Sequence, residues 1–231
     1  MIDILSPFGD GFGFSSKTFY DYDEVKLYPE EVGLISLKAI QKRKVEFYLG
    51  RAAARSALRQ INIYNFPVLK GANNEPLWPK GVVGAISHSG TIALAVAVLK
   101  DRTAGIGVDI ELIDQNVSED IVKEVCTFRE ATWVNLQQNQ KIERLLMIFS
   151  AKESAFKAFF PIKNVFLNYL DAEFSWNEDI GSFSGKLLKS AGGDYEKGYT
   201  FEVGCKIIDK YIFTFMKLPP MGLDMSTVNK A

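Results

Sequence analysis

Hydrophobic and polar positions repeat with a helical period in several stretches of the chain. Apolar residues return at nearly helical spacing over 37–61, so one long helix is expected there. A second long helical pattern covers 141–160, and Pro161 is expected to end it because proline cannot continue a helix. Two shorter helical patterns, at 118–126 and 129–138, precede the second long helix.

A hairpin is predicted between the two long helices. Residues 82–86 and 91–99 are apolar and rich in β-branched side chains, which is typical of buried strands. The polar stretch 87–90 separates them and is expected to form the turn, with Ser87 and His88 at its tip. A polar side chain at such a tip can point toward a ligand, although a surface histidine without a function explains the same pattern.

Strict alternation then marks a strand over 105–112. It predicts a half-buried strand with Asp109 and Glu111 on its open face. The tail from Pro219 is expected to be frayed. Four more strands are expected in the last third of the chain, at 171–176, 183–190, 199–207 and 211–217.

Composition narrows the class of protein. The chain has 231 residues, of which 47% are hydrophobic and 24% charged, and this excludes a disordered or fibrous protein. A formal net charge of -1 provides no general attraction for nucleic acid or membrane surfaces, so neither partner is expected. No secretory signal and no membrane-spanning run is found, and with only two cysteines we expect a cytoplasmic protein with reduced thiols.

The strand over 105–112 places two carboxylates together. Asp109 and Glu111 emerge on the same face, about 7 Å apart at the backbone, and can converge on one cation. Carboxylate oxygens suit Mg²⁺. The alternative is an ordinary solvated face of an edge strand. Cysteine and histidine sites for metals are not expected, because His88 is the only histidine.

The second long helix carries charges inside its apolar stripe. Lys152 falls within the stripe and Glu153 lies beside it, although such residues are rarely buried without a partner. The alternative is that Lys152 extends to solvent while Glu153 and Lys157 form a solvated ion pair. On the first long helix, Arg51 and Arg55 lie one turn apart and match the geometry of a phosphate group, or they form a plain solvated face.

Five motifs follow one another in a fixed order between residues 43 and 161. They are Gly50-Arg51-x-x-x-Arg55, Lys70-Gly71, Glu75-Pro76-x-Trp78-Pro79-x-Gly81-x-x-Gly84-x-x-Ser87-His88, Gly107-Val108-Asp109-Ile110-Glu111 and Phe149-Ser150-x-Lys152-Glu153-Ser154-x-x-Lys157-Ala158. In this order they resemble the Sfp-type phosphopantetheinyl transferases, in particular the branch associated with enterobactin synthetase. The resemblance covers about half of the chain.

This resemblance implies an enzyme that transfers the 4′-phosphopantetheine arm of coenzyme A to a serine of an acyl or peptidyl carrier protein and releases 3′,5′-ADP. Attack of an alcohol on a pyrophosphate requires charge neutralisation, positioning and a base. The implied metal ligands are Asp109, Glu111 and Glu153, holding Mg²⁺ or Mn²⁺, and Glu153 also takes the serine proton. The implied residues for coenzyme A are Arg43, Arg51, Lys70 and His88 at the adenosine end, Lys152 and Lys157 at the pyrophosphate, Arg55 at the ligand or behind Arg51, and Ser87. Lys157 is also an implied catalytic residue beside Glu153.

The family fold implied by the resemblance is an α+β pseudo-dimer. Each half is an antiparallel sheet packed with helices, and coenzyme A lies in the cleft between them. We place the halves at 1–102 and 103–231, so that the first is basic and the second carries the acidic strand and the catalytic helix. The carrier is expected to bind transiently to a monomer.

Two other classes of protein remain open at this point. One is a different Mg²⁺-dependent phosphotransfer enzyme or nucleotide hydrolase, although the chain lacks the glycine-rich loop of the P-loop enzymes. The other is a carrier-binding module without activity.

Overall fold

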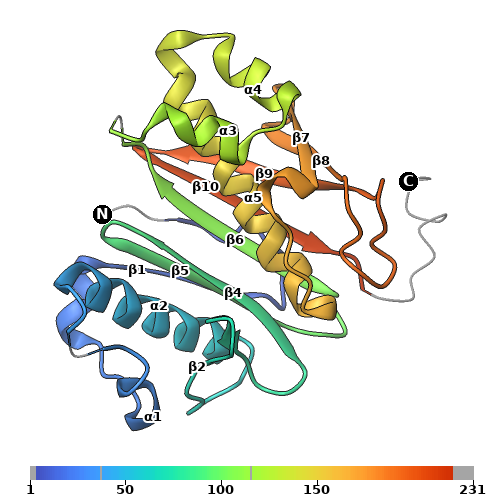
Figure 1. Cartoon of the computed structure of the whole chain (residues 1–231). Coiled ribbons are helices and arrows are strands. Elements are labelled where there is room, and N and C mark those ends of the chain that lie inside the picture. The colour runs from blue at the N-terminus through green and yellow to red at the C-terminus, as the bar shows by residue number, and fades with distance from the viewer. Residues whose placement is uncertain (1–3, 37, 115, 221–231) are drawn as a thin grey trace.

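A computed structural model describes residues 4–36, 38–114 and 116–220. Two antiparallel sheets lie side by side, and one long helix packs on each (Figure 1). The first sheet has the order β1 (Gly13–Thr18), β5 (Ile92–Leu99), β4 (Val82–Ser89). The second has the order β6 (Gly105–Leu112), β10 (Tyr211–Leu218), β9 (Thr200–Ile208), β8 (Ser182–Leu187), β7 (Ala172–Asn177). This confirms the expected α+β architecture with two halves.

The first half is built on α2 (Gln41–Gln60), which lies across the three-stranded sheet. Alanines form much of the contact, because Ala53 and Ala57 of α2 share one buried cluster with Ala95 and Ala97 of β5. Small side chains on both surfaces let the helix approach the sheet closely. The short elements of this half are η1 (Phe19–Glu24), α1 (Pro29–Val32), β2 (Leu69–Lys70) and β3 (Pro76–Leu77).

The second half is built on α5 (Lys141–Lys163), which packs on β6 and β10. Gly107 of β6 makes this contact possible, since a Cβ atom there would stand 1.8 Å from the carbonyl oxygen of Ser154. The close approach brings Glu153 and Lys157 of α5 next to Asp109 of β6. The remaining elements are η2 (Glu119–Ile121), α3 (Val122–Val125), α4 (Phe128–Asn135), η3 (Gln138–Gln140) and η4 (Tyr169–Asp171).

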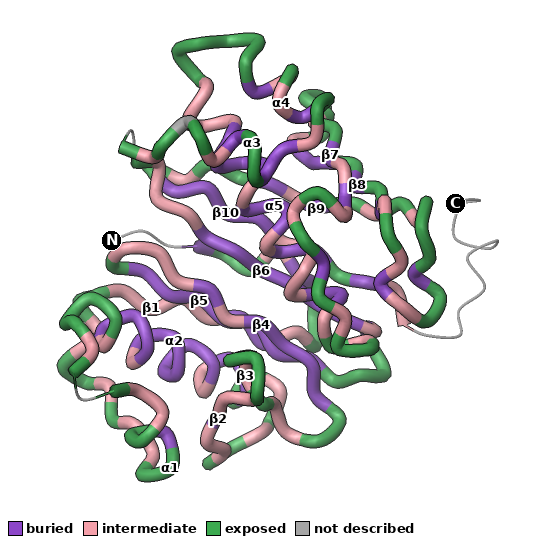
Figure 2. Tube along the Cα trace, viewed as in Figure 1, coloured by how far each residue is buried: buried purple, intermediate pink, exposed green. Residues whose placement is uncertain are grey.

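The two halves share part of their core. Val83 and Ala85 of β4 belong to the same buried cluster as Val108 and Ile110 of β6. In Figure 2 the strands β4, β5 and β6 form a continuous buried region across the molecule. The boundary between the halves is therefore a packed interface.

Three expectations about the first half and the hairpin need correction. The first long helix begins at Gln41, because Ile40 is extended and Ser36 starts a turn before it. The hairpin strand β4 continues to Ser89, so the turn is the residue pair 90–91, with Gly90 at φ 60. The strand β1 was not expected, because its sequence alternates weakly and it pairs only with β5.

Three more corrections concern the second half. Pro161 does not end α5, which continues to Lys163 and ends at Asn164 in the left-handed region with φ 54. A proline so close to the end of a helix removes a single backbone hydrogen bond, which the last turn tolerates. The expected helix over 118–126 is divided into η2 and α3. The strand β6 is buried on both faces through Ile110, because α5 covers the side that was expected to be open.

The other predicted elements are found within one to three residues of their expected ends. The expected frayed tail lies outside the described residues from 221 onward. Within the described ranges, no helix has the length and hydropathy required to cross a membrane.

Candidate active site

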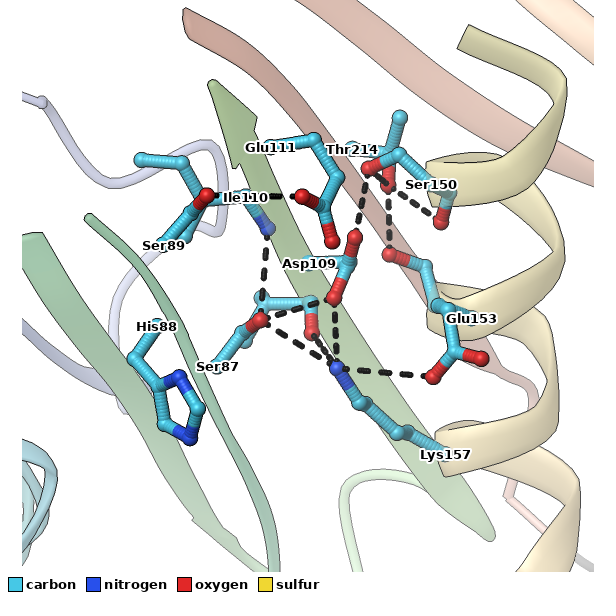
Figure 3. A network of polar contacts seen from close by, with 12 residues as sticks. Ser87, His88, Ser89, Asp109, Ile110, Glu111, Ser150, Glu153, Lys157 and Thr214 are labelled. Carbon is cyan, nitrogen blue, oxygen red and sulfur yellow. Dashed lines mark hydrogen bonds and ion pairs between the residues drawn. The ribbon is translucent and has the colours of Figure 1, made fainter. Parts of the chain in front are cut away.

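Asp109 is the centre of a polar network between the two halves (Figure 3). Its side chain is buried and accepts three hydrogen bonds. Ser87 Oγ of β4 donates to Oδ1 at 2.7 Å, and Ser150 Oγ of α5 donates to Oδ2 at 2.8 Å. Lys157 Nζ, also from α5, lies 2.6 Å from Oδ1. Two halves and three elements therefore meet at one carboxylate.

Serine side chains join the two sheets beside this carboxylate. The strands β4 and β6 are the facing edges of separate sheets and run in the same direction. Ile110 N–H donates to Ser87 Oγ at 3.3 Å, and Leu112 N–H donates to Ser89 Oγ at 3.0 Å. Ser89 Oγ in turn donates to Glu111 at 3.3 Å. Ser87 therefore lies at this join, and not at the tip of a hairpin as the sequence predicted.

Glu153 and Lys157 lie one turn apart on α5 and face the acidic strand. Lys157 Nζ is 3.9 Å from Glu153 Oε2, compared with 2.6 Å to Asp109. Both side chains are partly exposed, so the lysine joins a carboxylate network and is not simply half of a solvated pair. On the other oxygen of Glu153, Tyr169 Oη donates a hydrogen bond to Oε1 at 2.7 Å.

Negative charge exceeds positive charge in this network. Burial and the neighbouring Asp109 raise the pKa of Glu111 to about 8. Burial alone would lower the pKa of Lys157, but the surrounding carboxylates, chiefly Asp109 and Glu153, together raise it. Three carboxylates thus share one ammonium group, and this arrangement favours binding of a further cation.

The donor set fits a hard divalent cation. Asp109, Glu111 and Glu153 offer only oxygen atoms, which is the ligand type that Mg²⁺ and Mn²⁺ prefer. Among the residues described, no three acidic, histidine or cysteine side chains are already arranged to hold a metal ion. The ammonium of Lys157 lies between Asp109 and Glu153 instead. The chemistry of the donors fits a metal, and the three carboxylates need to converge further to bind it.

Glu111 predicts a pH dependence of stability in metal-free protein. A folded pKa of about 8 against an ordinary 4.5 means that the folded protein keeps a proton that the unfolded chain releases. The free energy of unfolding of wild type, relative to Glu111→Gln, is therefore expected to fall by about 1–4 kcal/mol as pH rises from 4.5 to 8. Above that pH the difference becomes constant.

Denaturant unfolding of both proteins in EDTA measures this dependence. Added Mg²⁺ is expected to reverse the loss in wild type only, because the cation stabilises the ionised carboxylate. A difference between the two proteins that stays constant over the whole pH range would contradict the prediction.

Four basic residues of the first half form a second cluster around Phe47. Arg51 and Lys70 lie over its ring, with Cζ at 4.6 Å and Nζ at 5.1 Å from the centroid. Arg43 Nη1 is 2.9 Å from His88 Nε2, which accepts the hydrogen bond. His88 follows Ser87 on β4 and therefore points to the opposite side, toward α2. Arg43, Arg51, Lys70 and His88 are thus brought together from three elements, as the resemblance implies.

The charges of Arg43, Arg51 and Lys70 repel one another. Burial lowers the pKa of Arg51 to about 10, and the charges of Arg55 and Arg43 act in the same direction. Burial lowers the pKa of Lys70, and Arg43 and Arg51 lower it too. The pKa of His88 is lowered by burial, with Arg43 contributing against the opposing charge of Glu46. Within the described part of the chain, the buried Nε of Arg51 has no hydrogen-bond partner. Glu46 lies 3.5 Å from Arg43 and 3.6 Å from His88 and balances part of this charge, whereas the free donor of Arg51 fits a bound anion.

Two sequence-predicted residues are occupied elsewhere. Arg55 donates to Glu31 Oε2 at 2.6 Å and to the carbonyl oxygen of Lys26 at 2.7 Å, so its guanidinium fixes the segment before α2. Lys152 is fully buried and lies 2.8 Å from Glu130, and it donates to backbone carbonyl groups as well. Neither side chain faces the carboxylate network. Arg55 and Lys152 therefore have structural partners, and the coenzyme A contacts expected of these two residues stay predictions.

A cavity of about 1060 Å³ opens next to Glu153 and Lys157. It lies between the loop and strand over 73–86 in the first half and the segment 164–171 in the second. Its walls are largely apolar and include the side chains of Trp78 and Phe156. Of the residues described, the four basic ones around Phe47 do not line it. The carboxylate network therefore separates a basic cluster on one side from an apolar cavity on the other.

Comparison with known proteins identifies the family of this chain. The family model for the 4′-phosphopantetheinyl transferase N-terminal domain matches residues 30–98, and that for the 4′-phosphopantetheinyl transferase superfamily matches 105–204. The 4′-phosphopantetheinyl transferase Npt of Nocardia iowensis is 30% identical over 79% of this chain and 79% of its own length. The chain belongs to the 4′-phosphopantetheinyl transferase family. It is an enzyme that transfers phosphopantetheine.

The matches to other relatives cover smaller parts of this chain and of the relatives. The 4′-phosphopantetheinyl transferase Svp of Streptomyces mobaraensis is 33% identical over 70% of this chain and 66% of its own length. Enterobactin synthase component D of Salmonella typhimurium is 36% identical over 63% of this chain and 59% of its own. The solved holo-[acyl-carrier-protein] synthase of Thermotoga maritima is 21% identical and covers 51% of this chain and 64% of its own, with a TM-score of 0.41.

Three residues of the transferase site were missed by the sequence analysis. Ser150 contacts Asp109, and Thr214 of β10 lies 2.9 Å from Ser150 through their hydroxyl groups. Tyr169 contacts Glu153. Ser150 lies within the quoted motif beside Lys152, so its place on the helix was a usable signal. Thr214 and Tyr169 come from strands and turns whose distance from α5 the sequence does not show.

Proposed function

We propose that this transferase is Mg²⁺-dependent and that Glu153 is its general base. The observation that supports the proposal is the meeting of Asp109, Glu111 and Glu153 around Lys157, beside a basic cluster that no acidic group fully neutralises. Asp109, Glu111 and Glu153 would hold Mg²⁺, or Mn²⁺ in its place, which neutralises the pyrophosphate of coenzyme A. The two halves are 1–102 and 103–231 in this proposal.

Coenzyme A would extend across the join between the halves. The adenosine 3′-phosphate binds at Arg43, Arg51, Lys70 and His88, because guanidinium and ammonium groups bind phosphate oxygens well. The pyrophosphate lies at Lys157, and the pantetheine arm enters the apolar cavity. Lys157 leaves Asp109 when the cation binds and moves its ammonium toward the pyrophosphate.

The chemical step is a substitution at phosphorus. The serine hydroxyl of an acyl or peptidyl carrier protein attacks the phosphorus that carries the pantetheine. The new bond joins the serine oxygen to that phosphorus, the pyrophosphate bond breaks, and 3′,5′-ADP leaves. Glu153 accepts the serine proton as the oxygen becomes a nucleophile. Glu153 lines the cavity wall, and we expect the serine to meet the pyrophosphate there.

Metal dependence tests the finer part of the proposal. Transfer is measured after EDTA treatment and after return of Mg²⁺, Mn²⁺ or Ca²⁺ to the same sample. We expect the rate to vanish with EDTA and to return with Mg²⁺ or Mn²⁺. A full rate in EDTA would contradict the assignment of the carboxylates to a metal.

Arg51→Ala is expected to weaken coenzyme A binding by about 10–100-fold and dephospho-coenzyme A binding by less than about 3-fold. The difference arises because a charge-assisted hydrogen bond to the 3′-phosphate is worth about 1.5–3 kcal/mol. Calorimetry with both ligands measures it. Arg59→Ala is the matched control, since Arg59 is exposed on the last turn of the same helix. Equal losses for both ligands would assign Arg51 to the structure of α2.

The proposal also takes the enzyme to act as a cytoplasmic monomer that meets its carrier transiently. Two free cysteines, both buried, fit a reducing compartment, and the net charge of -1 provides no general attraction for nucleic acid or membrane surfaces. No nucleic-acid or membrane partner is included. Light scattering with and without coenzyme A tests the monomer, and a stable dimer in both samples would contradict it.

A further inference from the structure

We propose that Tyr169 is a positioning residue, whose hydroxyl holds the Glu153 carboxylate in the orientation that receives the serine proton. This inference rests on the proposed function, because it takes Glu153 as the base. Tyr169 Oη donates to Glu153 Oε1 at 2.7 Å, and both residues line the apolar cavity. One oxygen of the base is thereby occupied. The other, Oε2, is directed toward Lys157, at 3.9 Å.

The ring of Tyr169 is held on both sides by α5. Its centroid is 5.5 Å from that of Phe149 and 5.8 Å from that of Phe156. These two rings lie on the helix one turn before and one turn after Glu153, so the tyrosine spans the turn that carries the base. The ring position is therefore fixed by packing before the hydroxyl makes its hydrogen bond.

The backbone of Tyr169 is held as well, and this explains the burial of Lys152. Lys152 Nζ donates to the carbonyl oxygens of Tyr169 and Ala172, at 2.5 Å and 3.1 Å, and to Glu130 at 2.8 Å. Two consecutive residues of α5 thus hold Tyr169. Lys152 donates to the backbone carbonyl oxygen of the tyrosine, and Glu153 accepts a hydrogen bond from the tyrosine hydroxyl. Lys152, the charged residue inside the apolar stripe, therefore acts on the site indirectly, because it anchors the turn that contains Tyr169.

The hydroxyl is suited to a fixed donor role. Its Oη already donates to Glu153 Oε1, at 2.7 Å. A glutamate side chain has three rotatable bonds, and a partly exposed one on a helix surface samples several orientations. Fixing one oxygen reduces this freedom before substrate binds, which is how a supporting residue increases the rate without touching the substrate.

The test compares Tyr169→Phe with Tyr199→Phe. Both variants remove one tyrosyl hydroxyl from the second half and keep the ring, but Tyr199 packs against Tyr195 and Phe201, away from Glu153. We expect Tyr169→Phe to lower kcat by about 5- to 50-fold, as loss of a hydrogen bond to a charged group does. KM for coenzyme A and for the carrier, and the coenzyme A affinity by calorimetry, should change less than 2-fold. Tyr199→Phe should match wild type.

A double-mutant cycle separates positioning from general stability. In a Glu153→Ala background, Tyr169→Phe should change the residual rate by less than 2-fold, because the hydroxyl then has nothing to orient. Thermal unfolding of each variant shows whether it folds. A wild-type kcat in Tyr169→Phe, or the same loss in both backgrounds, would overturn the inference. Absence of transfer by wild type would instead refute the proposed function.

Discussion

Glu153→Gln is expected to lower phosphopantetheine transfer by about 10²–10⁴-fold at saturating Mg²⁺ and coenzyme A. Glutamine keeps the size and one carbonyl oxygen, so Tyr169 retains an acceptor, but the proton acceptor is lost. Coenzyme A affinity should change little, because the cluster around Phe47 holds the adenosine end. Stopped transfer reactions over a range of pH measure the effect, and the loss should shrink as hydroxide replaces the base.

Metal titration distinguishes the two roles given to Glu153. If the residue were only a ligand, excess Mg²⁺ or Mn²⁺ would restore most of the rate at unchanged pH. Glu202→Gln, on the exposed face of β9, is the control and should behave as wild type. A wild-type rate in Glu153→Gln would contradict the catalytic role altogether.

Asp109→Asn is expected to lower transfer by at least about 10³-fold and to lower the free energy of unfolding by about 1–3 kcal/mol. Activity falls because the carboxylate is at once a metal ligand and the main partner of Lys157. Stability falls because Asp109 is 2% exposed and accepts from two serines, so an amide leaves one of these donors facing another donor.

Denaturant unfolding and transfer assays on the same preparation check both parts. Asp194→Asn is the control, since that aspartate is exposed in a loop. A folded Asp109→Asn protein that transfers at the normal rate would exclude Asp109 from the metal site. A normal rate with reduced stability would have the same meaning.

The chemistry of the site was more predictable than its geometry. The separation of Asp109 and Glu111 by one residue placed both on the same strand, and that arrangement is a local property. What covers the strand is not local. The sequence predicted an open face, and α5 lies on it because Gly107 leaves room for the helix backbone at Ser154. The sequence shows a glycine at position 107 of the strand, but it does not show that the backbone of α5 packs against this glycine.

Charged residues on the helices show the same limit. Arg51 and Arg55 are equivalent by spacing, yet one faces Phe47 and the other is bound by Glu31, a residue more than twenty positions earlier in the chain. The position of Lys152 inside an apolar stripe indicated a buried, paired charge, and the side chain is indeed buried. The cause of this burial is Glu130 and the turn at Tyr169, which only the folded chain brings near.

The overall architecture was predicted from the family motifs, whose glycines, prolines and charged residues follow one another in a fixed order. Edge elements were harder. The strand β1 has a mostly polar sequence, and its pairing with β5 is decided by the sheet that it joins. Ser87 was assigned to a turn because polar residues are typical of turns. Its hydroxyl instead forms hydrogen bonds to β6 across the two halves.

Intact mass spectrometry of a carrier protein tests the central claim most directly. An unmodified acyl or peptidyl carrier protein is incubated with the enzyme, coenzyme A and Mg²⁺, and 3′,5′-ADP is measured in the same mixture. We predict that the carrier gains one phosphopantetheine on its serine, that 3′,5′-ADP appears in equal amount, and that Glu153→Gln or EDTA suppresses both. An unchanged carrier mass with bound coenzyme A, or 3′,5′-ADP released without carrier modification, would contradict the account.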